Sequence, residues 1–480
     1  MPARALLAGF LLALAFPVLA TPQPRNATDM WFDPAESGWG LNLIHQGDTL
    51  FGTLFVYDTD GQPKWLVASA LVGGPTSYSG ALHECAGPWF GGSFSSVEVA
   101  CNAVGTMRFD LGDSTAVVDY TVGNVRVAKQ VQRFTFRPVT LSGSYEGYIL
   151  EAGGQRNQED WTFHVTENGS SFSMSASSDS EGICDYTGVS SQNGQYKTVS
   201  GSFRCNGGTR SGSWSMTVDP TTEGFSGSFV GDGFTNGRIA GARISGQLRM
   251  QGLGWRNDMW FIPSESGWGL NVIEQGDTLF ATLFVYDAQR RPRWYVASSL
   301  AQQGDATDGS VTYSGPLHSN TGPYFGTAFN PSAVGGRQVG QMSFRARADG
   351  TGELAYSVDN VQVTKTVQRF AFHKQNFSGT YLGSYEHDRQ AEIAIDDSGT
   401  EFRMQLVDLY GGAGTCTFVA PYMQLGSLRS MVGTFTCGST GGTFSMRHAT
   451  VSGQGFTARF DSPLFAFRVM ANEHIGGARR

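Results

Sequence analysis

One stretch of this sequence occurs twice. Residues 29 to 70, which begin DMWFDPAESGWGLNLIHQGDTLF, align without a gap to residues 258 to 299, and 30 of the 42 positions are identical. Similarity continues in two further pairs of segments, 78 to 94 against 313 to 329 and 122 to 136 against 358 to 372. A repeat of this kind indicates copies of one folding unit and not a single large core.

Each copy has a first half, A, and a more divergent second half, B. LSGSYEGY at 141 to 148 matches FSGTYLGS at 377 to 384, which marks the start of each B half. We therefore predict four domains in the order A1, B1, A2 and B2. Their predicted bounds are 25 to 139, 140 to 247, 255 to 375 and 376 to 475.

The composition favours strands over helices. The 480 residues include 64 glycines, 12% aromatic and only 15% charged residues, and no long segment shows a helical period. Short apolar runs separated by turn signals predict about seven strands in each A half. We expect an all-β protein of four small antiparallel barrels or sandwiches, because closure removes exposed strand edges.

The first twenty residues predict export. Arg4 precedes an apolar run from Ala5 to Leu19, and Ala20 ends a segment that suits signal peptidase. No later segment is apolar enough to span a bilayer as a helix. We therefore expect a signal peptide over residues 1 to 20 and a periplasmic or extracellular protein without a membrane span.

The six cysteines fall into three local pairs. No CxxC or Cys/His metal spacing is present, so we predict disulfides and no metal site. Each disulfide closes a short loop and contributes about 3 kcal/mol in the chain-entropy model. The predicted pairs are Cys85 with Cys101, Cys184 with Cys205, and Cys416 with Cys437.

The charge balance argues against a nucleic-acid partner. The formal net charge is −8, and lysines and arginines form no cluster along the chain. Phosphate recognition requires a basic face, so neither nucleic acid nor an anionic membrane is an expected partner.

The repeated motifs resemble a module of uncharacterised secreted proteins of proteobacteria. The resemblance rests on ESGWG-x-N, QGD, TLF and P-x-W, and it covers residues 29 to 69 and 258 to 298. It implies secretion and a β-repeat, and it implies no activity.

The last long strand predicted for A1, residues 124 to 136, carries two cations on an apolar face. Alternation places Lys129 and Arg133 on the same side as the valines, and the second copy repeats this with Lys365 and Arg369. A buried charge is costly unless it is paired, so each cation should meet a carboxylate. The acids kept in both copies are Glu36, Asp48 and Asp58, with Glu265, Asp277 and Asp287 as their counterparts.

Two interpretations of these cations remain open. They hold an anionic or polyhydroxylated ligand inside the A domain, or they form internal salt bridges with the arginine stacked over Trp39. The A domain also resembles calycin barrels such as lipocalins and avidins, in which a Trp on the first strand packs against a basic residue on the last. This resemblance agrees with the second interpretation. It implies a barrel, in which Trp39 would pair with Arg133 and Trp268 with Arg369.

The A halves are rich in tryptophan and tyrosine. Aromatic faces beside polar side chains bind sugar rings, although small β-domains also need large side chains to fill their cores. The predicted ligand-binding residues are Trp39, Trp65, Trp89, Lys129, Arg133 and Glu36 in A1, and Trp268, Trp294, Tyr324, Lys365, Arg369 and Glu265 in A2.

Catalytic signals are weak. Glu36 and Asp48 invite comparison with the paired carboxylates of glycosidases, but Asp48 is also a turn residue. The acidic turn at Asp58 loses its calcium ligands in the second copy, and His45 becomes Glu274. We expect no catalytic residues and no cofactor, and an enzyme is the less favoured hypothesis.

The leading prediction is an exported, non-catalytic binding protein with two equivalent A-domain sites for carbohydrate or another small polar ligand. Two linked sites would raise avidity on a repeating polymer. The alternatives are an envelope structural module that docks another envelope protein, and a secreted hydrolase.

Overall fold

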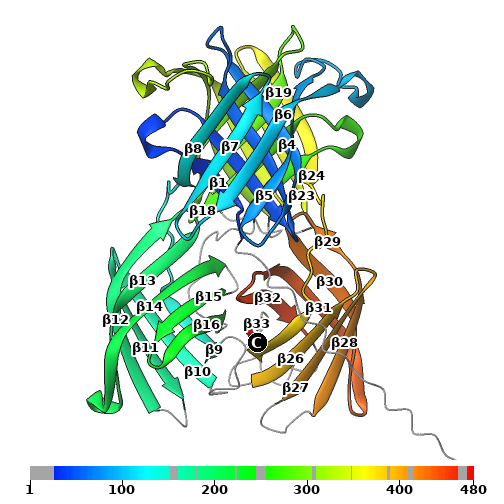
Figure 1. The fold of residues 1–480 in the computed structure, drawn as a ribbon. Coiled ribbons are helices and arrows are strands. Elements are labelled where there is room, and N and C mark those ends of the chain that lie inside the picture. Colours follow the sequence, from blue (N-terminus) through cyan, green and yellow to red (C-terminus); the bar gives the residue numbers. More distant parts are fainter. Residues whose placement is uncertain are drawn as a thin grey trace, which may run out of the picture.

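The computed structural model describes residues 26–151, 160–178, 182–221, 224–244, 256–304, 310–347, 349–385, 390–408, 414–462 and 473–480. The predicted signal peptide, residues 1 to 20, lies outside them. The described chain forms four antiparallel β-barrels, which confirms the all-β class (Figure 1). No helix in these ranges is long and apolar enough to cross a membrane.

Barrel A1 closes on itself through eight strands. Its last strand pairs with its first, where Trp31 lies opposite Arg133. The sequence predicted about seven strands; the additional one is β1, whose four residues are too few for alternation to identify it. The strands are β1 (Asp29–Phe32), β2 (Gly40–Gln46), β3 (Thr49–Tyr57), β4 (Pro63–Gly73), β5 (Ser77–Ala86), β6 (Ala100–Leu111), β7 (Thr115–Val122) and β8 (Val125–Arg133).

Barrel A2 repeats the strand order of A1. The same pairing of first and last strands closes it, with Trp260 opposite Arg369. Its strands are β17 (Asp258–Phe261), β18 (Gly269–Gln275), β19 (Thr278–Tyr286), β20 (Pro292–Gln302), β21 (Val311–Thr321), β22 (Gly335–Ala346), β23 (Thr351–Val358) and β24 (Val361–Arg369).

The B halves are also barrels. B1 contains β9 (Gly143–Glu151), β10 (Asp160–Asn168), β11 (Ser171–Ser178), β12 (Gly182–Asn193), β13 (Tyr196–Cys205), β14 (Arg210–Thr221), β15 (Gly224–Gly231) and β16 (Phe234–Arg243). B2 contains β25 (Gly379–Tyr385), β26 (Gln390–Asp397), β27 (Glu401–Asp408), β28 (Thr415–Pro421), β29 (Gln424–Leu425), β30 (Leu428–Cys437), β31 (Thr440–Val451), β32 (Gly455–Asp461) and β33 (Glu473–Arg479). Pairing of β28 with β30 closes B2, and β33 extends past the predicted domain end at residue 475.

Short 3-10 helices occupy some of the connections. They are η1 (Pro34–Glu36), η2 (Ser96–Glu98), η3 (Asn206–Gly208), η4 (Pro263–Glu265) and η5 (Pro331–Ala333).

Three disulfides join neighbouring strands, as predicted. The pairs are Cys85–Cys101 between β5 and β6, Cys184–Cys205 between β12 and β13, and Cys416–Cys437 between β28 and β30. Each pair lies directly across the strand register. The disulfides fit an oxidising compartment.

The two A barrels lie together at one end of the molecule (Figure 1). They pack face to face through one shared apolar cluster. Both barrels contribute matching residues to it, among them Met30, Ile44, Phe55 and Trp65 from A1 and Met259, Ile273, Phe284 and Trp294 from A2. The contacts are reciprocal, so the two barrels are related by an approximate twofold axis.

Each A barrel also extends an arm over its neighbour. We call residues 87–99 the A1 arm and residues 322–334 the A2 arm. Phe90 of the A1 arm packs against the core of A2, and Phe325 of the A2 arm is part of the core of A1. A Cβ on Gly87 would collide with the Tyr286 ring, so the arm can approach this closely only with glycine.

The B barrels are fixed to the A barrels by turns and linkers. The turn before β13 contacts A1, where the Gln195 amide donates to Asp29 at 3.2 Å, and the Ser427 amide of B2 donates to Asp258 at 2.8 Å. B1 and B2 contact each other through a small apolar cluster that includes Tyr148 and Leu382. The four barrels therefore form two stacked pairs (Figure 1).

Candidate functional site

The inner face of β8 carries both predicted cations. Val127, Val131 and Arg133 are buried, Lys129 is half-buried, and the residues between them are more exposed. This alternation follows from the two-residue period of a strand. The corresponding cations of A2, Lys365 and Arg369, occupy the same positions on β24.

Lys129 is paired with Glu36. Its ammonium lies 2.6 Å from Glu36 Oε1, and the Trp39 indole nitrogen donates to Glu36 Oε2 at 3.1 Å. Glu36 ends η1, whose first turn is capped by the side chain of Asp33. The two charged side chains are 18% and 23% exposed, so both keep contact with solvent. Barrel A2 builds the same group from Lys365, Glu265 and Trp268.

Arg133 is buried at a different place on the inner face. Its guanidinium lies 3.1 Å from Asp29 and also donates to the backbone oxygens of residues 26 and 28. It is sandwiched between the rings of Trp31 and Tyr196, each 4.5 Å away. Burial raises the pKa of Asp29 to about 6, against the opposing effect of Arg133.

The arginine therefore stacks on a different tryptophan from the one we predicted. We expected Arg133 over Trp39 and Arg369 over Trp268, but Arg133 contacts Trp31 and Arg369 lies 4.6 Å from the ring of Trp260. Trp31 and Trp260 lie on the first strands β1 and β17, and the arginines lie on the last strands. Trp39 precedes β2 and bonds to Glu36 instead.

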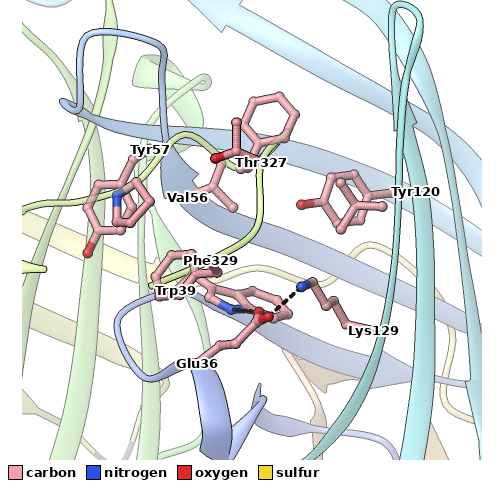
Figure 2. A pocket seen from close by; sticks show the side chains of 11 residues that line it. Glu36, Trp39, Val56, Tyr57, Tyr120, Lys129, Thr327 and Phe329 are labelled. Atoms are coloured by element: carbon pink, nitrogen blue, oxygen red, sulfur yellow. Dashed lines mark hydrogen bonds and ion pairs between the residues drawn. The ribbon is translucent and has the colours of Figure 1, made fainter. Parts of the chain in front are cut away.

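A small pocket opens beside the Glu36–Lys129 pair (Figure 2). Excluding the open mouth, the space free for a water-sized molecule is about 10 Å³, which is room for about one water and far less than an ordinary ligand site offers. The barrel contributes one wall, and the A2 arm contributes the other. The lining residues are Glu36, Trp39, Val56, Tyr57, Tyr120, Val127, Lys129, Pro323, Phe325, Thr327 and Phe329.

Two hydrogen-bond donors face this pocket. The Tyr120 hydroxyl points into the same space as the Lys129 ammonium (Figure 2), and within the described ranges it makes no hydrogen bond. Burial raises the pKa of Tyr120, so the phenol stays protonated and able to donate. Lys129 uses one of its three N–H groups on Glu36. The pocket thus offers two donors to an oxygen atom, with aromatic side chains beside them.

The remaining predicted aromatics lie elsewhere. Trp65 and Trp294 are buried between the A barrels, and each donates to a backbone carbonyl of the other barrel. Trp89 is 39% exposed on the A1 arm, and Tyr324 on the A2 arm packs beside the A1 core. The structure brings Glu36, Trp39 and Lys129 together and separates them from Trp65, Trp89 and Arg133.

The hydrolase and metal hypotheses gain no geometric support from the described residues. Asp48 is exposed and faces His373, and Asp58 pairs with Lys64 in a hairpin turn. The one cluster of possible metal ligands in these ranges contains Cys184 and Cys205, which are bonded to each other.

Some residues of the site escaped prediction from the sequence. Tyr57 and Tyr120 recur as Tyr286 and Tyr356 in the second copy, so their repetition was a usable signal. Phe325 and Thr327 reach A1 from the A2 arm. No pattern within A1 could have indicated them, because they lie about two hundred residues away in the chain.

Comparisons with known proteins identify no family for this chain. No protein-family model matches the chain, and no curated protein is significantly similar to it in sequence, so the resemblance to a secreted proteobacterial module has no support from these comparisons. Two solved structures of Transferrin Binding Protein B are weakly similar. A variant from Haemophilus parasuis Hp5 is 9% identical, covering 84% of this chain and 95% of its own, with a TM-score of 0.19. The isotype 1 protein from serogroup B Neisseria meningitidis is 11% identical, covering 95% and 89%, with a TM-score of 0.16. Such TM-scores establish neither a shared fold nor a shared function.

Proposed function

We propose that the protein is an exported, non-catalytic binding protein whose A barrels each hold a small polar ligand. The observation that carries this proposal is the pocket beside Glu36 and Lys129, where an ammonium and a phenol donate toward a space walled by aromatic rings. The same charged pair and tryptophan recur in A2. The proposal therefore assigns two equivalent sites to one chain.

The chemistry of the pocket supports a carbohydrate as the proposed ligand. Lys129 and Tyr120 donate to oxygen, and Trp39 offers an aromatic wall. A carbohydrate residue presents hydroxyl oxygens at its edge and apolar C–H groups on its face, so it suits both kinds of surface. The free space holds about one water molecule, so a sugar would bind at the mouth of the pocket with one polar group directed inward.

A titration of the full mature protein tests this function. Monosaccharides and short oligosaccharides are titrated calorimetrically, and we expect two sites per chain. Lys129→Met should reduce the stoichiometry to one, and adding Lys365→Met should abolish binding. Arg126→Met is the matched control, because Arg126 lies on the same strand but faces solvent. Binding that persists in the double variant, or the absence of binding across the sugar panel, would contradict the proposal.

A structural or protein-interaction role in the envelope is the second candidate. Two observations favour it. Glu36 and Lys129 already neutralise each other, so neither charge needs a ligand, and the pocket beside them is small. In that case the double lysine variant should keep its binding to an envelope protein. Crosslinking in intact cells, followed by identification of the crosslinked protein, distinguishes this role from ligand binding.

A further inference from the structure

Six polar atoms are buried where the two A barrels pack together. They are the amide nitrogen and oxygen of Asn42 and of Asn271, and the hydroxyl oxygens of Thr53 and Thr282. The four side chains are at most 2% exposed. None of the six atoms forms a hydrogen bond within the part of the chain that the structure describes.

The strand register places each pair in the middle of the packed face. In A1, cross-strand pairing gives the row Met30, Asn42, Thr53 and Val67. In A2, the row is Met259, Asn271, Thr282 and Val296. The outer members of both rows belong to the apolar cluster shared by the barrels. The polar side chains therefore point out of their own barrels and toward the interface.

Reciprocal contacts on either side of the rows fix how they meet. At one end of the packed faces Trp65 and Trp294 each bond to a carbonyl of the other barrel. At the other end Gln46 and Gln275 each bind the chain that leaves the other barrel. The two rows lie between these contacts, so the approximate twofold axis brings them opposite each other.

We infer that this interface contains a small internal hydration site, in which ordered water molecules bridge Asn42 and Thr53 to Asn271 and Thr282. Buried amides and hydroxyls are almost always hydrogen-bonded, and one buried water makes about three hydrogen bonds. An asparagine amide supplies both donors and acceptors, so water matches all six atoms. Apolar ligands and ions of one sign do not.

The hydration site reinforces the register of the A1–A2 interface. The reciprocal bonds of Trp65, Trp294, Gln46 and Gln275 oppose sliding at the two ends of the packed faces, and the bridged polar rows oppose it in the middle. A bridged polar row tolerates one alignment, in the way that a buried polar residue selects one register in other assemblies. That alignment also places each arm over the mouth of the neighbouring barrel.

A crystal structure of the full mature protein at a resolution that shows ordered water is the direct test. We expect water density within hydrogen-bond distance of both asparagine amides. Direct bonds between Asn42 and the side chains of A2, with no water between them, would overturn the inference.

Magnetic relaxation dispersion of water oxygen-17 provides a second measurement in solution. The variant Asn42→Leu, Thr53→Val, Asn271→Leu, Thr282→Val should lose about two or more long-lived water molecules relative to the unaltered protein. The control replaces Thr106 and Thr121 by Val, because these threonines form an exposed cross-strand pair. An unchanged number of long-lived waters in a folded interface variant would overturn the inference. Should that variant fail to fold, the crystal structure decides.

Discussion

The indole nitrogen of Trp65 donates a hydrogen bond to the backbone oxygen of Val285, 3.0 Å away in the other A barrel. The reciprocal bond joins Trp294 to Val56 at 2.9 Å. The P-x-W motif of each copy therefore supports the contact between copies. This assigns a packing role to two of the aromatic residues that the sequence had suggested as ligand contacts.

Removing that bond should weaken the protein. Trp65→Phe keeps an aromatic ring but removes the hydrogen bond to the Val285 carbonyl, whose net contribution is about 0.5–1.5 kcal/mol. Urea denaturation measures the change in free energy of unfolding. Trp89→Phe is the control, because Trp89 is 39% exposed, and it should change stability by less than about 0.5 kcal/mol. Equal effects of the two substitutions would contradict the assigned role of Trp65.

Gln46 should be equally sensitive. Its side chain bonds to the oxygen of Phe370 and to the amides of Phe372 and His373, at 2.9 to 3.1 Å. Gln46→Ala leaves these groups without partners, so we expect a loss of about 2–4 kcal/mol. Hydrogen exchange of the amides of residues 372 and 373 should accelerate strongly. Gln130→Ala, on the exposed side of β8, is the control. Faster exchange of the amides of residues 372 and 373 in this control would contradict a specific role of Gln46.

The disulfide of A1 should control one arm and not the other. Cys85 and Cys101 lie at the two ends of the A1 arm, whereas the corresponding positions of A2 are Asn320 and Gly336. Replacing both cysteines by Ala should cost about 3 kcal/mol. Hydrogen exchange should rise in residues 87–99 and stay unchanged in residues 322–334. A uniform rise in both arms would refute this local effect.

The buried aspartates predict a pH dependence. Burial raises the pKa of Asp29 and of Asp258 to about 6, above the value of about 3.8 for an exposed aspartate. Between these values the folded state binds more protons than the unfolded state, so stability should fall as the pH rises from about 4 to about 6. The slope is at most about 1.4 kcal/mol per pH unit for each group.

Asn substitution checks this slope. Asp29→Asn should lower stability, because Arg133 loses its carboxylate, and it should also reduce the loss between pH 4 and 6. Thermal unfolding across this range measures both effects. Asp119→Asn is the control: Arg126 lowers the pKa of Asp119, so that variant should keep the slope of the unaltered protein. If Asp29→Asn leaves the dependence of stability on pH unchanged, groups other than Asp29 cause that dependence.

The sequence alone determined the repeat, the β class, the three cysteine pairs and the inner face of the last A strand. Each of these depends on local information. A two-residue period decides which side chains share a face, and each predicted domain that contains cysteine contains two, so each cysteine has one partner within its own domain. The placement of Lys129 and Arg133 on an inner face follows from that period. The cost of burying an unpaired charge predicted a carboxylate partner, which Glu36 supplies to Lys129.

Only the tertiary structure decided what covers each face. Strand period and composition do not show whether an aromatic side chain on the outer face of a barrel contacts a ligand or another barrel. The sequence therefore could not assign a packing role to Trp65 and Trp294. The strand register placed Arg133 against Trp31 instead of Trp39. The crossing of the arms added Phe325 and Thr327 to the A1 pocket. All of these contacts join residues far apart in the chain. The contact of Arg133 with Trp31 requires one barrel to close, and the arm contacts require both copies to have folded against each other.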